Sequence, residues 1–228
     1  KLAGGFDAIG IDTWGVDFGL TDENGDLIGN PVHYRDSRTD NIPEELFKTV
    51  SREKVYEETG IQIMNFNTLY QLYYLEKYRP DILSKADKML FMPDLLNYFL
   101  TGVKKNEYTI ASTSQMLNPY TRDWNRKLLK EVGIRENLLC DIVSPGTVLG
   151  NLSEDVCSEL GVKSVPVIAV GSHDTASAVV SVPTQEKDFV YISCGTWSLF
   201  GTELSEPVIS EKGLAASYTN EGGYGGNI

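Results

Sequence analysis

An almost uninterrupted apolar run at residues 165–170 is the feature that most restricts the fold of this chain. Such a run is typical of a strand that is buried on both faces, as in the sheet of an α/β protein. Gly171, Ser172, His173 and Asp174 follow as a turn, and small residues at 175–180 begin a helix. A strand, a turn and a helix in this order predict one edge of an α/β fold, with polar side chains at the carboxyl end of the strand.

The rest of the chain divides into blocks of different character. Residues 6–34 predict β structure, with a strand at 6–12 and a hairpin turn at Asn24-Gly25. Residues 43–135 have mainly helical periodicity, and residues 189–201 predict a strand, a Gly-Thr turn and a second strand. A polar linker at 183–187 separates the last two blocks and predicts a domain boundary there.

Several helix ends are predicted from capping residues. The predicted caps are Asn67 before an apolar stripe at Leu69, Leu72 and Tyr73, with Pro80 as the stop; Pro93 in a first turn with Gly102 as the stop; Gly133 after a helix at 122–132; and Ser153 with Gly161. The buried strand and these helices together indicate the α/β class.

The net charge excludes several classes of function. Twenty Lys and Arg face 32 Asp and Glu, which gives a formal charge of −12. Binding to nucleic acid or to an anionic membrane needs neutralisation of phosphates by basic side chains, so neither partner is expected. Three cysteines without a CxxC pair indicate neither a disulfide framework nor a zinc site, and two histidines give no metal site. A reducing cytoplasm is therefore the expected location.

The turn at Gly171-Ser172-His173-Asp174-Thr175 is the sharpest candidate site. Ligands of open α/β sheets bind outside the carboxyl ends of the strands, and a helix begins at the same place. Asp174 could therefore act as a general base, with His173 bonded to a substrate hydroxyl. Alternatively, Asp174 only caps the helix, and the pattern by itself favours that interpretation.

Two further segments carry weaker signals. In the Gly195-Thr196 turn, backbone N–H groups and a hydroxyl could face a phosphate, although a plain hairpin turn is the better interpretation and no Walker loop is present. Trp14 could stack on a sugar or lie in the core, and Gly15 suits a close approach of a ligand to the backbone. Asp12 and Asp17 invite the hypothesis of a glycosidase pair, but in one continuous strand they would point to opposite faces.

A polar segment at His33, Arg35, Asp36 and Arg38 follows the predicted hairpin. Its arginines could clamp a substrate. An exposed loop of ion pairs is the favoured interpretation, because such pairs are common on protein surfaces and contribute little to stability.

Seven blocks in this order resemble the FGGY family of carbohydrate kinases, which have an actin-like, ribonuclease-H-like two-domain fold. The blocks lie at residues 9–18, 34–39, 66–72, 92–94, 172–179, 195–199 and 219–223. They include Thr13-Trp14-Gly15, Met92-Pro93-Asp94, Ser172-His173-Asp174-Thr175 and Gly195-Thr196-Trp197. Together they cover nearly the whole chain, and their combination is specific although each block alone is weak.

The resemblance is to those family members that act on L-rhamnulose in rhamnose catabolism. It implies ATP-dependent phosphorylation at the 1-hydroxyl, with Asp174 as the catalytic base and Gly15, His173, Asp174 and Thr175 as sugar-binding residues. Thr196 matches a position that contacts ATP, and Mg²⁺ would arrive with the nucleotide. The alternatives are an FGGY kinase for another ketose and a non-catalytic sugar-binding module.

The same resemblance predicts that the chain is truncated at both ends. Residues 1–183 match most of the family's N-terminal domain without its first phosphate-loop hairpin, and residues 184–228 match the beginning of the C-terminal domain. The family's further sugar-contacting Asn lies in a later block, so Asn227 is not assigned to it. The adenosine site and the magnesium ligands are expected outside these residues, and the 228 residues alone are expected to lack appreciable kinase activity.

Overall fold

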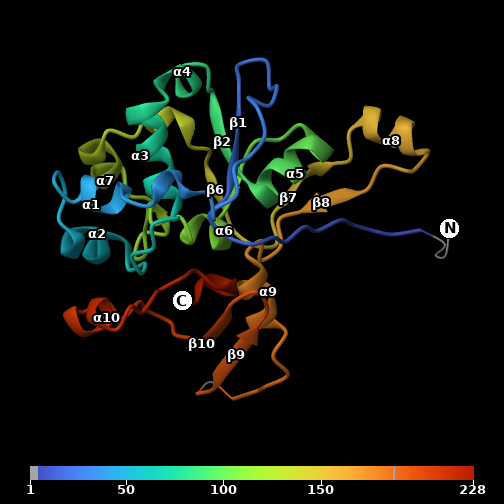
Figure 1. Ribbon diagram of the computed structural model, residues 1–228. Coiled ribbons are helices and arrows are strands. Elements are labelled where there is room, and N and C mark those ends of the chain that lie inside the picture. Colours follow the sequence, from blue (N-terminus) through green and yellow to red (C-terminus); the bar gives the residue numbers. More distant parts are fainter. Residues whose placement is uncertain (1–4, 187) are drawn as a thin grey trace.

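The computed structural model describes residues 5–186 and 188–228 (Figure 1). Its largest part is a helical block built on a strand pair, β1 (Phe18–Thr21) and β2 (Lys88–Phe91), which run antiparallel. In Figure 1, an arm with β7, β8 and α8 extends from one side of this block, and α9, β9, β10 and α10 lie below it. The fold is α/β, as predicted.

The helices and strands have the following bounds. The helices are α1 (Ile42–Leu46), α2 (Arg52–Thr59), α3 (Thr68–Tyr78), α4 (Pro80–Leu83), α5 (Met92–Thr101), α6 (Tyr108–Ser112), α7 (Arg126–Val132), α8 (Glu154–Leu160), α9 (Asp174–Val180) and α10 (Glu211–Ala215), with short 3₁₀ turns at Ser37–Thr39, Glu136–Leu138 and Tyr224–Gly226. The remaining strands are β3 (Asn106–Glu107), β4 (Leu117–Asn118), β5 (Asp123–Trp124), β6 (Ile142–Val143), β7 (Val148–Asn151), β8 (Pro166–Ile168), β9 (Val190–Cys194) and β10 (Ser198–Thr202).

The main core lies between α3, β2 and α7. Leu69 and Leu72 of α3, Phe91 of β2 and Leu128 of α7 are fully buried in one apolar cluster. Burying each of these side chains stabilises the fold by about 1.5–3 kcal/mol relative to leaving it exposed. The stripe predicted for α3 is therefore confirmed, with Tyr73 packed against the cluster but only half-buried.

Most of the predicted helix ends are confirmed. Pro93 occupies the first turn of α5, and Gly102 ends that helix in the left-handed conformation with φ of 74°. Ser153 accepts a hydrogen bond from the Val156 amide at the start of α8, and Gly161 ends it. Gly133 likewise ends α7 in the left-handed conformation.

The prediction for α7 is wrong at its start, because the helix begins at Arg126 rather than at residue 122. The Asn125 side chain accepts the Leu128 amide there, while Arg122 lies in a turn with φ of 58°. Asn67 precedes α3 as predicted, but its side chain donates to the Gln62 carbonyl instead of capping the helix.

Pro80 follows the end of α3 and also begins the next helix, because it occupies the first turn of the short helix α4. The hairpin turn at Asn24-Gly25 is present, and its return is a bridge between Thr21 and Leu27 rather than a full strand.

The two predicted strands at 6–12 and 165–170 are shorter than expected. Residues 6–12 form no regular strand; Ile9 makes one parallel bridge to Val167 of β8. Strand β8 has three residues and pairs antiparallel with β7 across a bulge. Val167 and Ala169 are 0% exposed whereas their neighbours are half-buried, so the run alternates in burial instead of being covered on both faces.

Strands β9 and β10 form the predicted hairpin, with Cys194 opposite Ser198 at its turn. The predicted linker 183–187 has no regular structure over 183–186, and residue 187 lies outside the described residues. The domain boundary between residues 183 and 184 stays a prediction.

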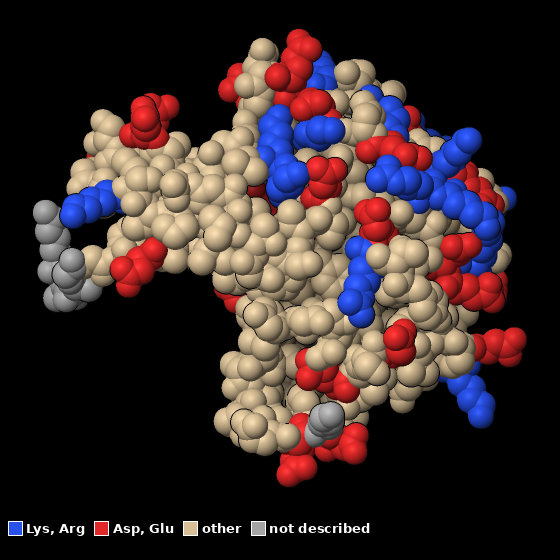
Figure 2. Space-filling view, turned by 180° about the vertical axis from the view of Figure 1, so that it is seen from behind, with Lys and Arg blue, Asp and Glu red and all other residues tan. Residues whose placement is uncertain are grey.

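On the face drawn in Figure 2, acidic and basic side chains are mixed over the helical block. In the described part of the chain, no helix combines the length and the apolarity needed to cross a membrane.

Candidate active site

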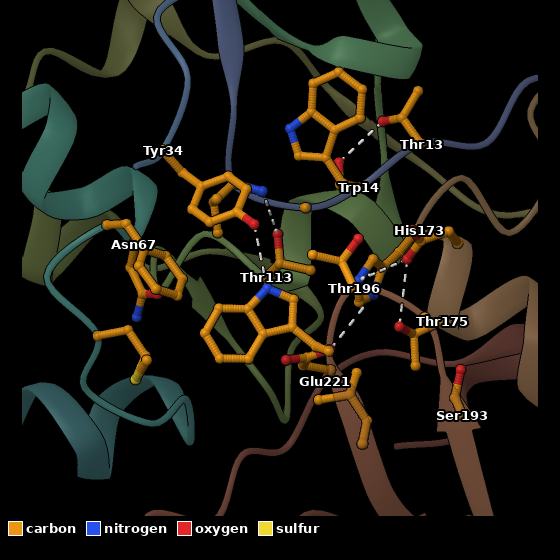
Figure 3. A pocket seen from close by; sticks show the side chains of 18 of the residues that line it. Thr13, Trp14, Tyr34, Asn67, Thr113, His173, Thr175, Ser193, Thr196 and Glu221 are labelled. Atoms are coloured by element: carbon orange, nitrogen blue, oxygen red, sulfur yellow. Dashed lines mark hydrogen bonds and ion pairs between the residues drawn. The ribbon is translucent and has the colours of Figure 1, made fainter. Parts of the chain in front are cut away.

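A cavity of about 1000 Å³ lies between the helical block and the β9–β10 hairpin (Figure 3). Its walls come from five parts of the chain, namely residues 12–16, 33–35, 61–67, 173–175 and 193–199, together with Thr113 and Glu221. All five residues that the sequence singled out, Gly15, His173, Asp174, Thr175 and Thr196, line this one cavity. The volume is at the upper end of the range for small-molecule sites.

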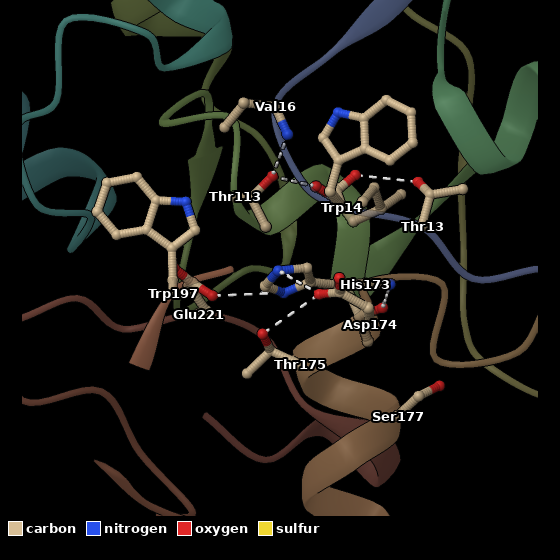
Figure 4. A network of polar contacts seen from close by, with 12 residues as sticks. Thr13, Trp14, Val16, Thr113, His173, Asp174, Thr175, Ser177, Trp197 and Glu221 are labelled. Carbon is tan, nitrogen blue, oxygen red and sulfur yellow. Dashed lines mark hydrogen bonds and ion pairs between the residues drawn. The ribbon is translucent and has the colours of Figure 1, made fainter. Parts of the chain in front are cut away.

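Asp174 is the first residue of α9, and its side chain is 56% exposed. The backbone of His173 occupies the N-cap position, and no side-chain cap is formed there. The Asp174 carboxylate accepts a hydrogen bond from the Thr175 hydroxyl at 3.3 Å and lies 3.5 Å from Nε2 of His173 (Figure 4). The interpretation of Asp174 as a simple helix cap is therefore wrong, and its carboxylate is accessible from the cavity.

His173 lies between two carboxylates. Its ring is 7% exposed, and its Nδ1 lies 3.4 Å from Oε2 of Glu221 without a hydrogen bond of good geometry. Glu221 is half-buried and lines the cavity from the segment after α10. The ring is thus held at the cavity wall with Asp174 at one nitrogen and Glu221 at the other.

Residues 13–16 run beside this turn. The Thr13 amide donates to the Ser172 carbonyl at 3.0 Å, and the Asp174 amide donates to the Thr13 carbonyl at 2.9 Å. Two segments that are 160 residues apart in sequence are therefore joined by backbone hydrogen bonds on both sides of His173.

Gly15 packs directly against Thr113. A Cβ atom at Gly15 would lie 3.0 Å from Oγ1 of Thr113 and 3.2 Å from its Cβ, which is closer than side chains normally approach. The next residue, Val16, has a φ of 66°, which is strained for a β-branched residue. Its amide donates to Thr113 Oγ1 at 3.2 Å, and its carbonyl accepts from the Thr68 hydroxyl at 2.7 Å. Such strain is typical of functional sites.

Trp14 does not lie in the core. Its side chain is 42% exposed and lines the cavity, and its indole N–H donates to Oδ2 of Asp17 at 2.8 Å. Asp17 is buried, and burial raises its pKa, partly offset by the bonds from Trp14 and from the Tyr34 amide. Asp12 is exposed at the cavity wall, so Asp12 and Asp17 differ in environment and do not form the paired carboxylates of a glycosidase.

The far wall of the cavity is aromatic and belongs partly to the hairpin. The turn at Gly195 and Thr196 joins β9 to β10 and faces the cavity, and Trp197 follows it. The ring of Phe66 lies 6.0 Å from that of Trp197 and 5.1 Å from that of Tyr34. Arg35 lines the same wall, whereas Arg38 donates to Gln71 away from the cavity, so the two arginines do not clamp one ligand.

The described residues contain no group of three His, Cys, Asp or Glu side chains that could hold a metal ion.

The sequence patterns did not predict two residues of the site, Glu221 and Thr113. Glu221 belongs to the block at 219–223 that resembles the family, but no strand or helix pattern before it indicates a site residue. Thr113 lies in a hydroxyl-rich run at 109–114, which is the only sequence signal that could have indicated it. Both reach the cavity through tertiary contacts.

Comparisons with known proteins agree on one family. Residues 5–181 match the model of the N-terminal domain of the FGGY family of carbohydrate kinases. The chain is 49% identical over 221 residues to a rhamnulokinase of Bacteroides thetaiotaomicron, covering 97% of this chain and 46% of that protein. It is also 49% identical over 216 residues to a rhamnulokinase of Oceanobacillus iheyensis, covering 95% and 46%. The chain thus spans less than half the length of these relatives.

Solved structures show the same fold at lower identity. A ligand-bound xylulose kinase from Lactobacillus acidophilus superposes with a TM-score of 0.85 at 21% identity, covering 93% of this chain and 43% of that one. A gluconate kinase from the same organism gives 0.83 at 21% identity, covering 96% and 45%. These likenesses confirm the fold that the sequence predicted.

Proposed function

Because this chain belongs to the FGGY family of carbohydrate kinases, we propose that the protein transfers a phosphoryl group from ATP to the 1-hydroxyl of L-rhamnulose. The choice of sugar is supported by relatives at 44–49% identity that are named rhamnulokinase. One observation carries the proposal: the accessible carboxylate of Asp174 lies in the same cavity as the Gly195-Thr196 turn.

Asp174 is the general base in this proposal. Its carboxylate accepts the proton of the 1-hydroxyl while the hydroxyl oxygen bonds to the γ-phosphorus, and the bond from that phosphorus to the β,γ-bridging oxygen breaks. Only the proton transfer is assigned to a side chain of this chain.

The sugar lies against Gly15, His173 and Thr175. Gly15 lines the cavity with its backbone, because Thr113 fills the space that a side chain at this position would need, and the Thr175 hydroxyl already bonds to the Asp174 carboxylate. Trp14 offers an exposed aromatic face at the cavity wall, which suits contact with the C–H groups of a sugar ring. These groups would orient the hydroxyl toward Asp174.

Thr196 contacts the phosphates in this proposal, from the turn between β9 and β10. ATP supplies the phosphoryl group, and magnesium enters with it to neutralise phosphate charge.

We place the protein in the cytoplasm, with residues 184–228 opening a second domain. We expect residues 1–228 by themselves to give no ADP release in a coupled assay.

The test compares Asp174→Asn with Asp12→Asn in the product of the complete reading frame that encodes this chain. Both carboxylates line the cavity and are exposed, but only Asp174 lies at the start of α9. We expect Asp174→Asn to lower kcat by about 100-fold or more with sugar binding retained, and Asp12→Asn to keep most of the turnover. Equal activity of parent and Asp174→Asn would contradict the proposal and favour a non-catalytic sugar-binding module.

A second assay addresses the sugar. L-Rhamnulose, L-fuculose and xylulose compete at equal concentration, and the ratio of kcat/KM values decides among them. A preference for another ketose would keep the kinase reaction and replace the substrate, in line with the fold shared with xylulose kinase.

A further inference from the structure

Glu107 is a buried carboxylate with no role in the proposed reaction. It is 1% exposed and occupies the N-cap position of the short helix α6. Its Oε1 accepts the Thr109 amide at 2.9 Å, and its Oε2 accepts the Ile110 amide at 3.1 Å. A cap of this kind is usually on the surface, so full burial of the charge calls for a further reason.

The same carboxylate also holds the turn that precedes Asp174. The Ser172 amide donates to Oε2 of Glu107 at 3.1 Å, and the His173 amide donates to Oγ1 of Thr109 at 3.1 Å. The Thr109 hydroxyl in turn donates to Oε2 of Glu107 at 2.6 Å. Two consecutive amides of the turn are therefore bound by side chains that lie 64 and 65 positions earlier in the chain.

Each group bonded to the Glu107 oxygens is a donor. The ionised carboxylate is therefore the form that these bonds accommodate, although burial raises its pKa. Three N–H groups and one hydroxyl bond to it, and bonds of this type to a charged group are among the stronger ones in proteins. These bonds offset part of the cost of burying the charge.

A second layer fixes Glu107 itself. Its amide donates to Oδ1 of Asp94 at 3.1 Å, and the Asn106 side chain donates to Oδ2 of Asp94 at 3.0 Å. Asp94 belongs to α5, which packs against β1 and β2. The position of the turn is thus tied to the main core on one side and, through Thr13, to the sugar wall on the other.

We propose that Glu107 and Thr109 are positioning residues for Asp174. They bind the amides of Ser172 and His173 and so fix the backbone from which the Asp174 carboxylate faces the cavity. This inference rests on the proposed function, because the consequence for turnover needs Asp174 as the base. A misplacement of about 1 Å of a catalytic group can lower a rate by about 100-fold.

The first test does not need activity. Amide hydrogen exchange is measured in the product of the complete reading frame for the parent, Glu107→Gln, Thr109→Val and Thr109→Ser. Whichever way a Gln amide is turned, its NH₂ faces an N–H donor of this cluster, either the Thr109 amide or the amides of Ile110 and Ser172. Because either orientation disrupts the cluster that holds the turn, we expect exchange at Ser172 to speed up by about tenfold or more. Thr109→Val removes the acceptor of His173, so that amide exchanges faster, whereas Thr109→Ser retains protection.

The second test measures kinetics in the product of the complete reading frame. We expect Glu107→Gln and Thr109→Val to lower kcat by about tenfold or more with a small change in KM for the sugar, and Thr109→Ser to restore kcat. Thr21→Val is the matched control, because Thr21 is also a fully buried threonine, but its hydroxyl bonds to the Lys88 carbonyl and not to the turn before Asp174. It is expected to keep the parent's kcat below its unfolding transition.

Several outcomes would overturn the inference. Unchanged exchange at Ser172 and His173 in both variants would show that the bonds do not hold the turn. Unchanged kcat, or a loss that Thr21→Val reproduces, would assign Glu107 and Thr109 to stability alone. If the parent itself phosphorylates no ketose, the proposed function fails, while the exchange data still decide whether these residues hold the turn.

Discussion

The indole N–H of Trp197 donates to the phenol oxygen of Tyr34 at 3.3 Å, although the two residues are 163 positions apart. Trp197 belongs to the β9–β10 turn and Tyr34 to the segment after β1, and both line the cavity. Phe66 packs against both rings. This contact therefore joins the hairpin that carries Thr196 to the helical block beside the proposed site.

Tyr34→Phe tests the importance of that bond, because it removes the phenol oxygen and keeps the ring. We expect Trp197 to become more accessible, with stronger acrylamide quenching of tryptophan fluorescence and a KM for the sugar raised by about two- to tenfold. Tyr78→Phe is the matched control, since its hydroxyl bonds to Glu45 on the exposed surface. Equal quenching in Tyr34→Phe and the parent would show that the bond does not hold the walls together.

Gly15→Ala tests the close approach of Gly15 to Thr113. The added methyl group would lie 3.0 Å from Thr113 Oγ1, and relieving this contact costs about 1–3 kcal/mol or moves the Val16 backbone. We expect a lower unfolding midpoint in urea and sugar binding weakened by about tenfold, measured by calorimetry. Gly150→Ala is the control, because its methyl group would have an ordinary contact of 3.5 Å. Parent-like sugar affinity in Gly15→Ala would remove Gly15 from the sugar site.

Local signals in the sequence predicted the helix ends well. Pro93, Gly102, Ser153 and Gly161 act within a few residues of the chain, and all four occupy the predicted positions. The candidate turn at 171–175 was also found, because a strand that ends in Gly and polar residues is a local pattern. The resemblance to one family gave specific roles to the weaker candidates Gly15 and Thr196, and both line the same cavity.

The hydrogen-bond partners of side chains in irregular segments, and contacts between distant segments, could not be predicted from such local patterns. The side chain of Asn67 donates to the Gln62 carbonyl rather than capping α3. The indole of Trp14 donates to Asp17 at the cavity wall rather than packing in the core. Strand β8 is short because it pairs with β7 across a bulge. Glu107 carried no signal, since its partners at Ser172 and His173 are brought to it only by the fold.

Thr196→Val tests the nucleotide side of the cavity. It keeps the size of the side chain and removes the hydroxyl, so we expect KM for ATP to rise by about five- to thirtyfold with sugar binding unchanged. Thr202→Val is the control in the same hairpin, because its hydroxyl bonds to the Phe189 carbonyl and it does not line the cavity. If the two variants have equal KM for ATP, Thr196 makes no contact with the phosphates.

Asp94 gives a prediction for the pH dependence of stability. Burial raises its pKa well above the ordinary value of 3.8, in spite of the hydrogen bonds from Asn106 and Glu107. Between pH 3.8 and its pKa in the folded chain, the folded state binds more protons than the unfolded state. Its contribution to the free energy of unfolding therefore falls as the pH rises through this window and is constant below it.

Urea unfolding of the parent and Asp94→Asn from pH 2 to 7 measures this contribution. The difference in the free energy of unfolding, parent minus Asp94→Asn, is expected to fall by up to about 1.4 kcal/mol per pH unit within the window. Asp81→Asn is the control of opposite sign, because a hydrogen bond from Arg79 lowers the pKa of the exposed Asp81. For Asp81 the stabilisation is present above pH 3.8 and is lost as the pH falls. A difference for Asp94→Asn that rises with pH would show that its hydrogen bonds outweigh burial.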